Sequence, residues 1–208
     1  MGSHQEYQQL AGILANLARC ALGKGKCFNK IEVSCYGNLH DSAEAFLPIC
    51  VGVLTDEGPI QNEQEAQALL DRKGIMFRNR EADITKKYDE SITLDLLEDE
   101  TCLVSVRGTF TENKMMIARV NDFDNLYLAP HGCNIFFEYE DKPGVIAKLS
   151  RILSISEINI ADIRAPQVKI GPVPRSLAAI KTDTEVPDEL LTKMAGFVNA
   201  ISAFKFNC

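Results

Sequence analysis

One stretch of the sequence limits the fold more than any other: residues 136–146 form the pattern of a strand that passes through a Pro-Gly turn directly into an amphipathic helix. After the turn, apolar side chains recur at the helical period of 3.6 residues and form a single stripe. They are Val145, Ile146, Leu149, Ile152 and Leu153. Residues 158–163 then alternate apolar and polar side chains, as a half-buried strand does. The sequence therefore predicts a β-α-β unit.

A second strand-helix-strand pattern follows the first. Residues 176–180 form a short β run, Pro187 opens a helix with the same apolar spacing, and residues 201–206 alternate again. The segment 164–175 between the two patterns predicts a long loop. Helices with only one apolar face need a sheet to cover, so we expect a ferredoxin-like βαββαβ domain with both helices on one face of the sheet and the other face uncovered.

The upstream part of the chain predicts helices followed by antiparallel strands. Helices are expected over residues 8–22, 42–54 and 62–73, and strands over 28–36, 91–96, 102–106 and 115–120. Ser42 is expected to cap the second helix, and Pro48 to kink or restart it. The fold class is therefore α+β, with a mixed α/β domain over residues 5–129 and the βαββαβ domain over residues 130–208. Gly2, Ser3 and His4 resemble the remnant of an expression tag and are left out of this prediction.

Charge and cysteine usage exclude several classes of partner. The chain has 22 basic and 29 acidic residues, a formal net charge of −7, whereas nucleic acid and anionic membranes reward concentrated Lys and Arg. No apolar run reaches membrane-spanning length. The seven cysteines contain no C-x-x-C pair and follow no signal peptide, so a reducing cytoplasm is the expected location.

The sequence contains no pattern typical of a catalytic centre. It has no G-x-G-x-x-G after a strand, no Walker loop and no G-x-S-x-G elbow. The three histidines, His4, His40 and His131, lie far apart without metal-ligand spacing, and His131 is expected to be a linker residue. We therefore expect no catalytic residue, no metal and no cofactor in this chain.

The turn before the first predicted helix is the best candidate for a binding site. A helix that begins near Gly144 and Val145 exposes unpaired N–H groups, which suit the carboxylate of a free amino acid. Asp141 can then contact the ammonium group. Asn159, followed by Ile160, can donate and accept together, and Tyr139 can add a hydroxyl. Structural roles remain open for each: a helix cap for Asp141, a turn for Asn159 and a packed ring for Tyr139.

These same residues resemble a known family. The run Tyr139-x-Asp141-Lys142-Pro143-Gly144-Val145, the later strand start at residues 158–160 and the Pro187 helix resemble an ACT domain. Upstream, residues 10–17, 31–37, 73–75 and 106–110, together with Asn62, resemble the intervening domain of the longer D-3-phosphoglycerate dehydrogenases. The resemblance covers nearly the whole chain. It identifies the chain as similar to the C-terminal regulatory region of that family, whose NAD-binding catalytic domain lies outside these residues.

The resemblance implies a ligand and a partner. Matching positions of the family bind L-serine where two ACT domains meet, so it implies that Tyr139, Asp141 and Asn159 bind L-serine or another small amino acid in a homo-oligomer. Related intervening domains can also bind an anion. Here the stretch 121–125 is acidic, and three basic residues are either anion ligands or solvated strand-face charges. They are Arg107, Lys114 and Arg119.

Two other functions remain open at this point. One is the regulatory subunit of an iron-sulfur L-serine dehydratase, which uses a similar domain pair, although the Ser-rich stretch ending in His-Thr near the start of that family is not found. The other is an oligomerisation module whose ACT site binds no ligand.

Overall fold

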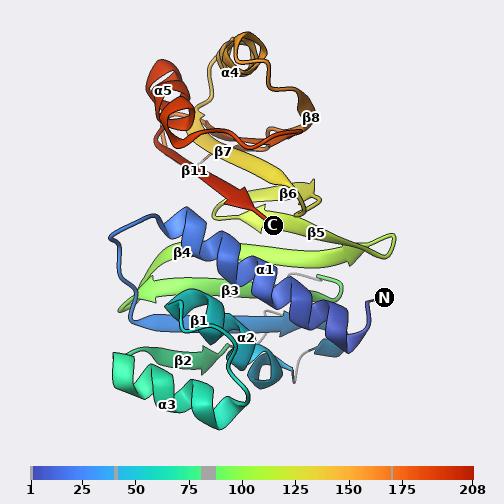
Figure 1. Cartoon of the computed structure of the whole chain (residues 1–208), viewed down its shortest axis with the longest axis vertical. Helices are drawn as coiled ribbons and strands as arrows, with labels where there is room; N and C mark the ends of the chain where they lie inside the picture. Colours follow the sequence, from blue (N-terminus) through green and yellow to red (C-terminus); the bar gives the residue numbers. More distant parts are fainter. Residues whose placement is uncertain (1, 40–41, 81–87, 170) are drawn as a thin grey trace. The chain divides into compact units, whose positions relative to one another are not determined.

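A computed structural model describes residues 2–39, 42–80, 88–169 and 171–208 of the chain, and it confirms the predicted α+β class. The chain divides into two compact units, Met1–Asn121 and Asp122–Cys208 (Figure 1). The predicted boundary after residue 129 stays a prediction; the second unit begins with the strand β6 (Phe123–Leu128), which the sequence analysis missed.

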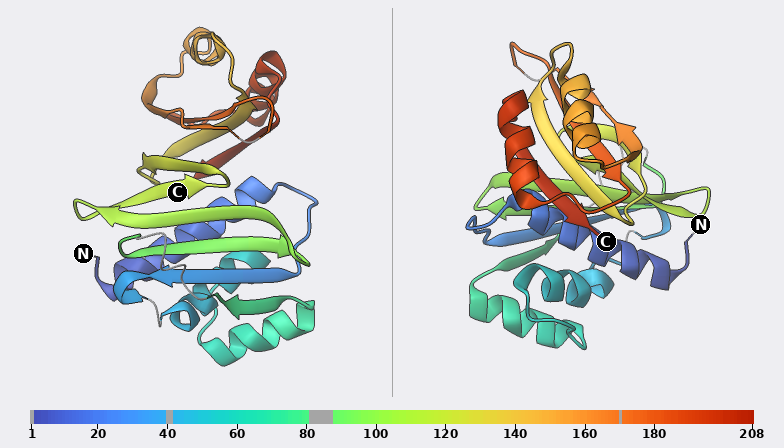
Figure 2. Two further views of the ribbon diagram at one scale, coloured as in Figure 1. Left: turned by 180° about the vertical axis from the view of Figure 1, so that it is seen from behind. Right: turned by 45° about the horizontal axis from the view of Figure 1, so that its top comes forward.

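The first unit is a sheet with helices on one face (Figure 2). Its strands lie in the order β2-β1-β3-β4-β5, with β2 parallel to β1 and the other neighbours antiparallel. The strands are β1 (Lys30–Tyr36), β2 (Met76–Asn79), β3 (Ser91–Glu98), β4 (Thr101–Thr111) and β5 (Lys114–Val120). The helices are α1 (His4–Leu22), α2 (Ala43–Thr55) and α3 (Glu63–Lys73), with a short 3₁₀ turn at Gly37–Leu39.

Local signals fix the helix ends, and two of the predictions for them are wrong. Helix α1 starts before residue 8 because Ser3 and Glu6 form a reciprocal capping box, so the tag-like leader belongs to the helix. Ser42 makes no side-chain cap bond to α2, and that helix continues through Pro48 without a restart. Helix α3 covers nearly all of the predicted range 62–73, and Asn62, which was expected to be its first residue, is its N-cap.

Helix α1 packs tightly on the sheet through its apolar stripe. Leu10, Leu14 and Leu17 are fully buried. At Gly108 of β4 an added Cβ would lie 2.7 Å from the Leu10 Cδ1 atom, so the absence of a side chain there allows the helix to approach the strand closely.

The second unit has the predicted βαββαβ order. It consists of β7 (Cys133–Glu140), α4 (Val145–Ile155), β8 (Ile160–Arg164), β10 (Arg175–Thr182), α5 (Asp188–Val198) and β11 (Ser202–Asn207), and the strands lie in the order β11-β7-β10-β8. Both helices cover one face (Figure 2), and their apolar stripes form a core with the strands. Its central members are Ile135, Phe137, Leu149, Leu153, Ala178, Ile180, Met194 and Val198.

Two features of the second unit differ from the prediction. Strand β9 (Gln167–Val168) pairs with β10 inside the segment predicted to be a loop. In addition, the sheet face opposite the helices, which was expected to be uncovered, carries the apolar side chains of Phe136, Leu177, Ala179 and Phe206, all of them buried. Apolar side chains on both faces of β7 explain the difference, since successive residues of a strand point to opposite faces.

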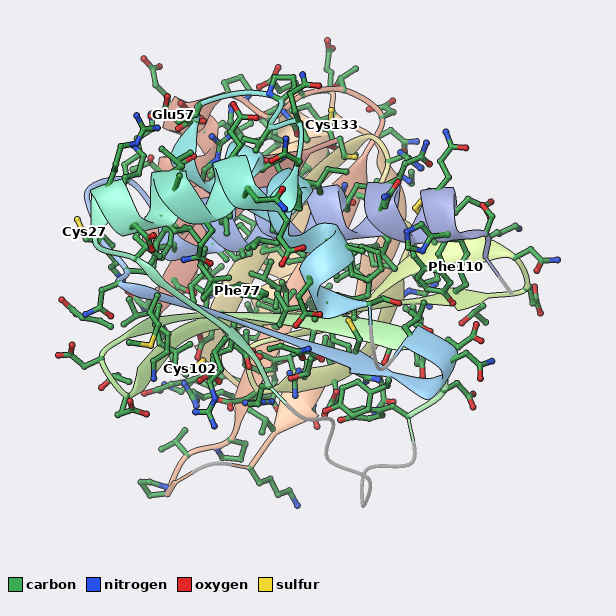
Figure 3. All side chains as sticks on the ribbon, turned by 90° about the horizontal axis from the view of Figure 1, so that it is seen from below. Cys27, Glu57, Phe77, Cys102, Phe110 and Cys133 are labelled. Atoms are coloured by element: carbon green, nitrogen blue, oxygen red, sulfur yellow. The ribbon has the colours of Figure 1, made fainter. Side chains whose placement is uncertain are left out.

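Thiols and apolar helices add two further facts. All seven cysteines are free, and Cys27 and Cys102, for example, lie apart on different segments of the first unit (Figure 3). Within the part of the chain that the structure describes, no helix is both long enough and apolar enough to cross a membrane.

Candidate functional site

The turn between β7 and α4 leaves the start of the helix without a side-chain cap. Gly144 occupies the N-cap position with a φ of 87°, a left-handed conformation that favours glycine, and among the described residues no side chain caps the first turn. The cap role for Asp141 is therefore wrong. The Asp141 N–H donates to the carbonyl of Pro174 (2.9 Å), which ties the turn to the segment before β10, and its carboxylate remains partly exposed.

Tyr139 lies beneath this turn in the core of the second unit. It is 3% exposed and packs in the same cluster as Val145 and Leu149. Ser176, which lies opposite it on β10, donates a hydrogen bond to the Pro166 carbonyl (3.1 Å). Burial raises the pKa of Tyr139, so the phenol is neutral at physiological pH. The packed-ring role is confirmed, whereas a contact between its hydroxyl and a ligand stays a prediction.

Asn159 and Ile160 lie at the other end of α4, at the start of β8. The Asn159 N–H donates to the Asp183 carboxylate (3.1 Å), and its carbonyl accepts from the Asp183 N–H (3.1 Å). Asn159 is exposed and lines a groove of about 330 Å³. The other lining residues are Ser150, Ser154, Glu157, Ile158 and Ile160. The sequence analysis missed Ser150 and Ser154, although their i, i+4 spacing on the polar side of α4 was visible.

A single chain does not bring the predicted site residues together. Helix α4 has 11 residues, and a rise of about 1.5 Å per residue separates its two ends by roughly 16 Å. The sheet register agrees, because Tyr139 lies opposite Ser176 of β10 whereas Ile160 lies opposite Thr182. Tyr139, Asp141, Gly144 and Val145 therefore form one half of the candidate site, and Asn159 and Ile160 form the other.

The three basic residues considered for an anion are also not gathered at one point. Arg107 and Arg119 face each other across β4 and β5, while Lys114 lies at the hairpin turn. Arg119 donates to the Ser105 hydroxyl (2.8 Å), and the Arg107 guanidinium lies 3.7 Å from the centre of the Tyr88 ring. Since Arg107 is only 6% exposed, its description as a solvated charge is wrong.

The histidines and other potential metal ligands give no second site. His4 stacks on Phe46, His131 lies 3.9 Å from the Cys208 sulfur, and His40 lies outside the described residues. Among the described residues, no group of three or more His, Cys, Asp and Glu side chains is placed to hold a metal ion.

Comparison with known proteins gives weak but consistent matches. No protein-family model matches the chain. Proteins named D-3-phosphoglycerate dehydrogenase are 22% identical over 141 residues in Bacillus subtilis (68% of this chain, 26% of that protein) and 25% identical over 182 residues in Archaeoglobus fulgidus (85% and 34%). The Mycobacterium tuberculosis protein of the same name is 25% identical over 139 residues (65% and 25%). This chain is similar to part of D-3-phosphoglycerate dehydrogenase.

The similar region is a minor part of those proteins. The match spans only about a quarter to a third of their length. Among solved structures, a chain described as GqqA, a novel type of quorum quenching acylases, aligns with a TM-score of 0.28 and 13% identity over 36% of this chain and 41% of its own length. A similarity at this level does not indicate a shared fold.

Proposed function

We propose that this chain is a regulatory, amino-acid-sensing part of a D-3-phosphoglycerate dehydrogenase, acting in L-serine biosynthesis and located in the cytoplasm. Its ligand is L-serine or another small amino acid, and it mediates feedback inhibition. Catalysis and NAD binding belong to the remainder of the longer protein. The names of the relatives support the link to this enzyme, and the intervening and ACT domain assignments are part of the proposal.

The observation that carries this proposal is the uncapped start of α4 beside a partly exposed carboxylate. The N–H groups of the first turn suit the ligand carboxylate, because a helix N-terminus carries a partial positive charge. Asp141, three residues before the Gly144 N-cap, suits the ligand ammonium. The Asn159 groove provides the complementary half.

The separation of the two halves requires a second copy of the chain. Because one chain holds Asp141 and Asn159 at opposite ends of α4, a two-fold pairing of two copies would place Asp141 of each beside Asn159 of the other. Each dimer would then hold two equivalent ligand sites. The homo-oligomer is therefore part of the same proposal.

Calorimetry with L-serine tests the proposal directly. We expect saturable binding to the unmodified chain and no measurable binding to Asp141→Ala or Asn159→Ala. An equimolar mixture of these two variants should regain about a quarter of the sites, because random pairing makes half of the dimers mixed and one of the two sites in each mixed dimer keeps both residues. Asp71→Ala, on the surface of α3 in the first unit, is the control and should bind normally.

Three results would contradict the proposal. The absence of binding by any small amino acid would favour the ligand-independent oligomerisation module. Unchanged affinity in both variants would remove the proposed site. If the mixture does not bind L-serine although both variants remain dimeric, the proposal of a site shared between two copies is wrong. The residues that precede Gln5 in the full-length protein separate the dehydrogenase from the iron-sulfur dehydratase, and the names of the relatives favour the dehydrogenase.

A further inference from the structure

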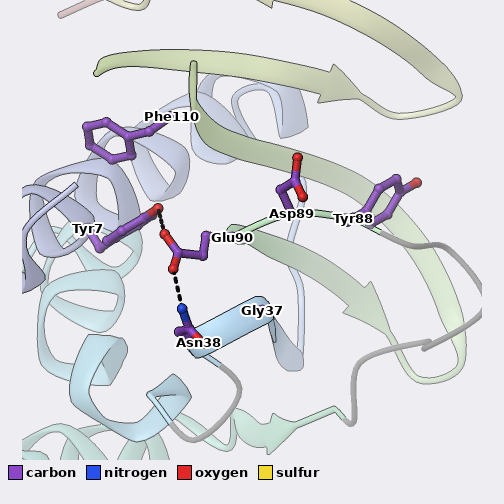
Figure 4. A pocket seen from close by; sticks show the side chains of 7 residues that line it. All are labelled: Tyr7, Gly37, Asn38, Tyr88, Asp89, Glu90 and Phe110. Carbon is purple, nitrogen blue, oxygen red and sulfur yellow. Dashed lines mark hydrogen bonds between the residues drawn. The ribbon is translucent and has the colours of Figure 1, made fainter. Parts of the chain in front are cut away.

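A cavity of about 410 Å³ lies in the first unit, where α1 passes the ends of β1, β3 and β4 (Figure 4). Its wall includes the carboxylates of Asp89 and Glu90, the amide of Asn38 and the aromatic rings of Tyr7 and Phe110. The volume lies in the range of small-molecule sites, which are about 300–1,000 Å³. None of these residues belongs to the proposed serine site.

The Glu90 carboxylate is held in one position from several sides. The Tyr7 hydroxyl donates to one oxygen (3.0 Å), and the Asn38 amide donates to the other (2.8 Å). The Thr109 hydroxyl donates to the Glu90 carbonyl (2.7 Å). Gly37 packs so closely that an added Cβ would lie 3.0 Å from the Glu90 Cγ atom. This carboxylate is therefore pre-organised before any ligand arrives.

Among the residues that the structure describes, no ion pair balances the charge of this wall. Both donors to Glu90 are neutral, and within the described residues neither Asp89 nor Glu90 forms an ion pair. Carboxylates that are withdrawn from water favour a cationic partner. Within the described part of the chain, the cavity therefore presents two adjacent carboxylates, one of them half-buried, that have no ion-pair partner.

The aromatic rings favour the same type of partner. Tyr7 and Phe110 meet edge to face with ring centroids 4.8 Å apart, and Tyr7 is 2% exposed. The face of an aromatic ring attracts a cation through its quadrupole. Burial and the Glu90 carboxylate raise the pKa of Tyr7, so its hydroxyl stays protonated and continues to donate.

We propose that this cavity binds a small organic cation with a primary ammonium group, and that a short diamine which reaches from Glu90 to Asp89 binds best. One ammonium group lies against the Glu90 carboxylate beside the ring of Phe110, which is partly exposed whereas Tyr7 is buried. The second lies against Asp89, the neighbouring residue in the lining, whose carboxylate points in a different direction from that of Glu90 (Figure 4). Anions are disfavoured by the same two carboxylates.

A titration with 1,4-diaminobutane at constant ionic strength tests this site. Binding is monitored through the amide NMR signals of the full chain. Saturable shifts are expected at Tyr7, Gly37, Asn38 and Phe110. Glu90→Gln keeps an acceptor for Asn38 but removes the charge, so binding should weaken by about 10-fold or more, as expected for loss of a charge-assisted hydrogen bond. Asp89→Asn should weaken the diamine and leave 1-aminobutane unchanged.

The remaining outcomes are also decisive. Tyr7→Phe keeps the ring and should weaken binding by only about two- to tenfold, which provides a test if Glu90→Gln does not fold. Asp71→Asn removes a carboxylate remote from the cavity and should leave the binding of the diamine unchanged. If sodium chloride produces the same shifts, or if Glu90→Gln or Tyr7→Phe binds as tightly as the unmodified chain, the proposal is overturned. The result is independent of L-serine binding, since the two sites lie in different units.

Discussion

The two sheets of this protein share one plan but differ in the chemistry of the face opposite their helices. In the first unit that face carries buried polar side chains, namely Glu32, Ser34, Thr93, Asp95 and Arg107. In the second unit the corresponding face carries Phe136, Leu177, Ala179 and Phe206. The first face depends on compensation of charge, and the second on close packing. The same α+β architecture can therefore be completed in two physically different ways.

Arg80 is the centre of the polar face. Glu32 and Asp95 lie directly opposite each other on β1 and β3, a pairing of like charges that is unfavourable by itself. The Arg80 guanidinium lies 3.2 Å from Asp95 and 3.7 Å from Glu32, and its Nε donates to the Ser34 hydroxyl (3.1 Å). This one cation therefore bridges both carboxylates.

The largest expected effect is on the apolar face. Phe136→Ala should lower the free energy of unfolding of the second unit by about 3–5 kcal/mol, because a fully buried ring is replaced by a cavity. Denaturant unfolding measures this. Phe204→Ala is the matched control: its ring stacks on Phe136 at 4.7 Å but is only half-buried, so the loss should be smaller. Equal losses would show that stacking, and not burial, dominates this face.

A smaller effect is expected when the polar face loses its bridging cation. Arg80→Ala should lower the free energy of unfolding by about 2 kcal/mol, less than for a fully buried pair because the Arg80 side chain is 42% exposed. Asp95→Asn in the same chain should restore part of the loss, since it removes the like-charge pairing. A double-mutant cycle measures the coupling, and simple additivity would contradict the bridging role.

The smallest effect on stability at neutral pH is expected from two buried thiols of the first unit, those of Cys35 and Cys50. Burial raises the pKa of Cys35 and of Cys50 to about 12, from an ordinary value of 9. In the unfolded chain these thiols ionise first, so their contribution is fully present below pH 9 and is lost as the pH rises towards 12.

The stability of the first unit should therefore fall between pH 9 and 12, and Cys50→Ala should flatten that slope, whereas the exposed Cys27→Ala should leave it unchanged. Urea unfolding at pH 7.5 and 10.5 checks this. The buried core of the second unit contains no cysteine. The pH dependence of the stability of that unit should therefore follow the raised pKa of Tyr139 instead. An identical slope in Cys50→Ala would contradict the assignment.

Periodicity predicted most of the fold, and local chemistry explains where it failed. The stripes of α1, α4 and α5 are strong enough to be visible in the sequence alone. Strand β6 was missed because its acidic beginning resembled a linker, and β9 because a two-residue strand has no period. The buried second face of β7 was hidden because Phe136 and Phe137 fit either an exposed or a covered strand.

The candidate site was only partly visible in the sequence. The Pro143-Gly144 turn predicts an exposed helix start, and the structure has one. The distance between Asp141 and Asn159 follows from the length of α4, which runs between them, so the helix predicted there already implied that the two residues lie apart. The cavity around Glu90 joins residues 7, 38, 90 and 110, which are separated too widely for any sequence pattern.

The placement of Asp141 and Asn159 at opposite ends of one helix has a consequence for how such a sensor would behave. If the site is shared as proposed, a monomer does not bind the amino acid, and each bound amino acid also stabilises the dimer. The response would then depend on the abundance of the protein as well as on that of the amino acid. Dilution alone would switch such a sensor off.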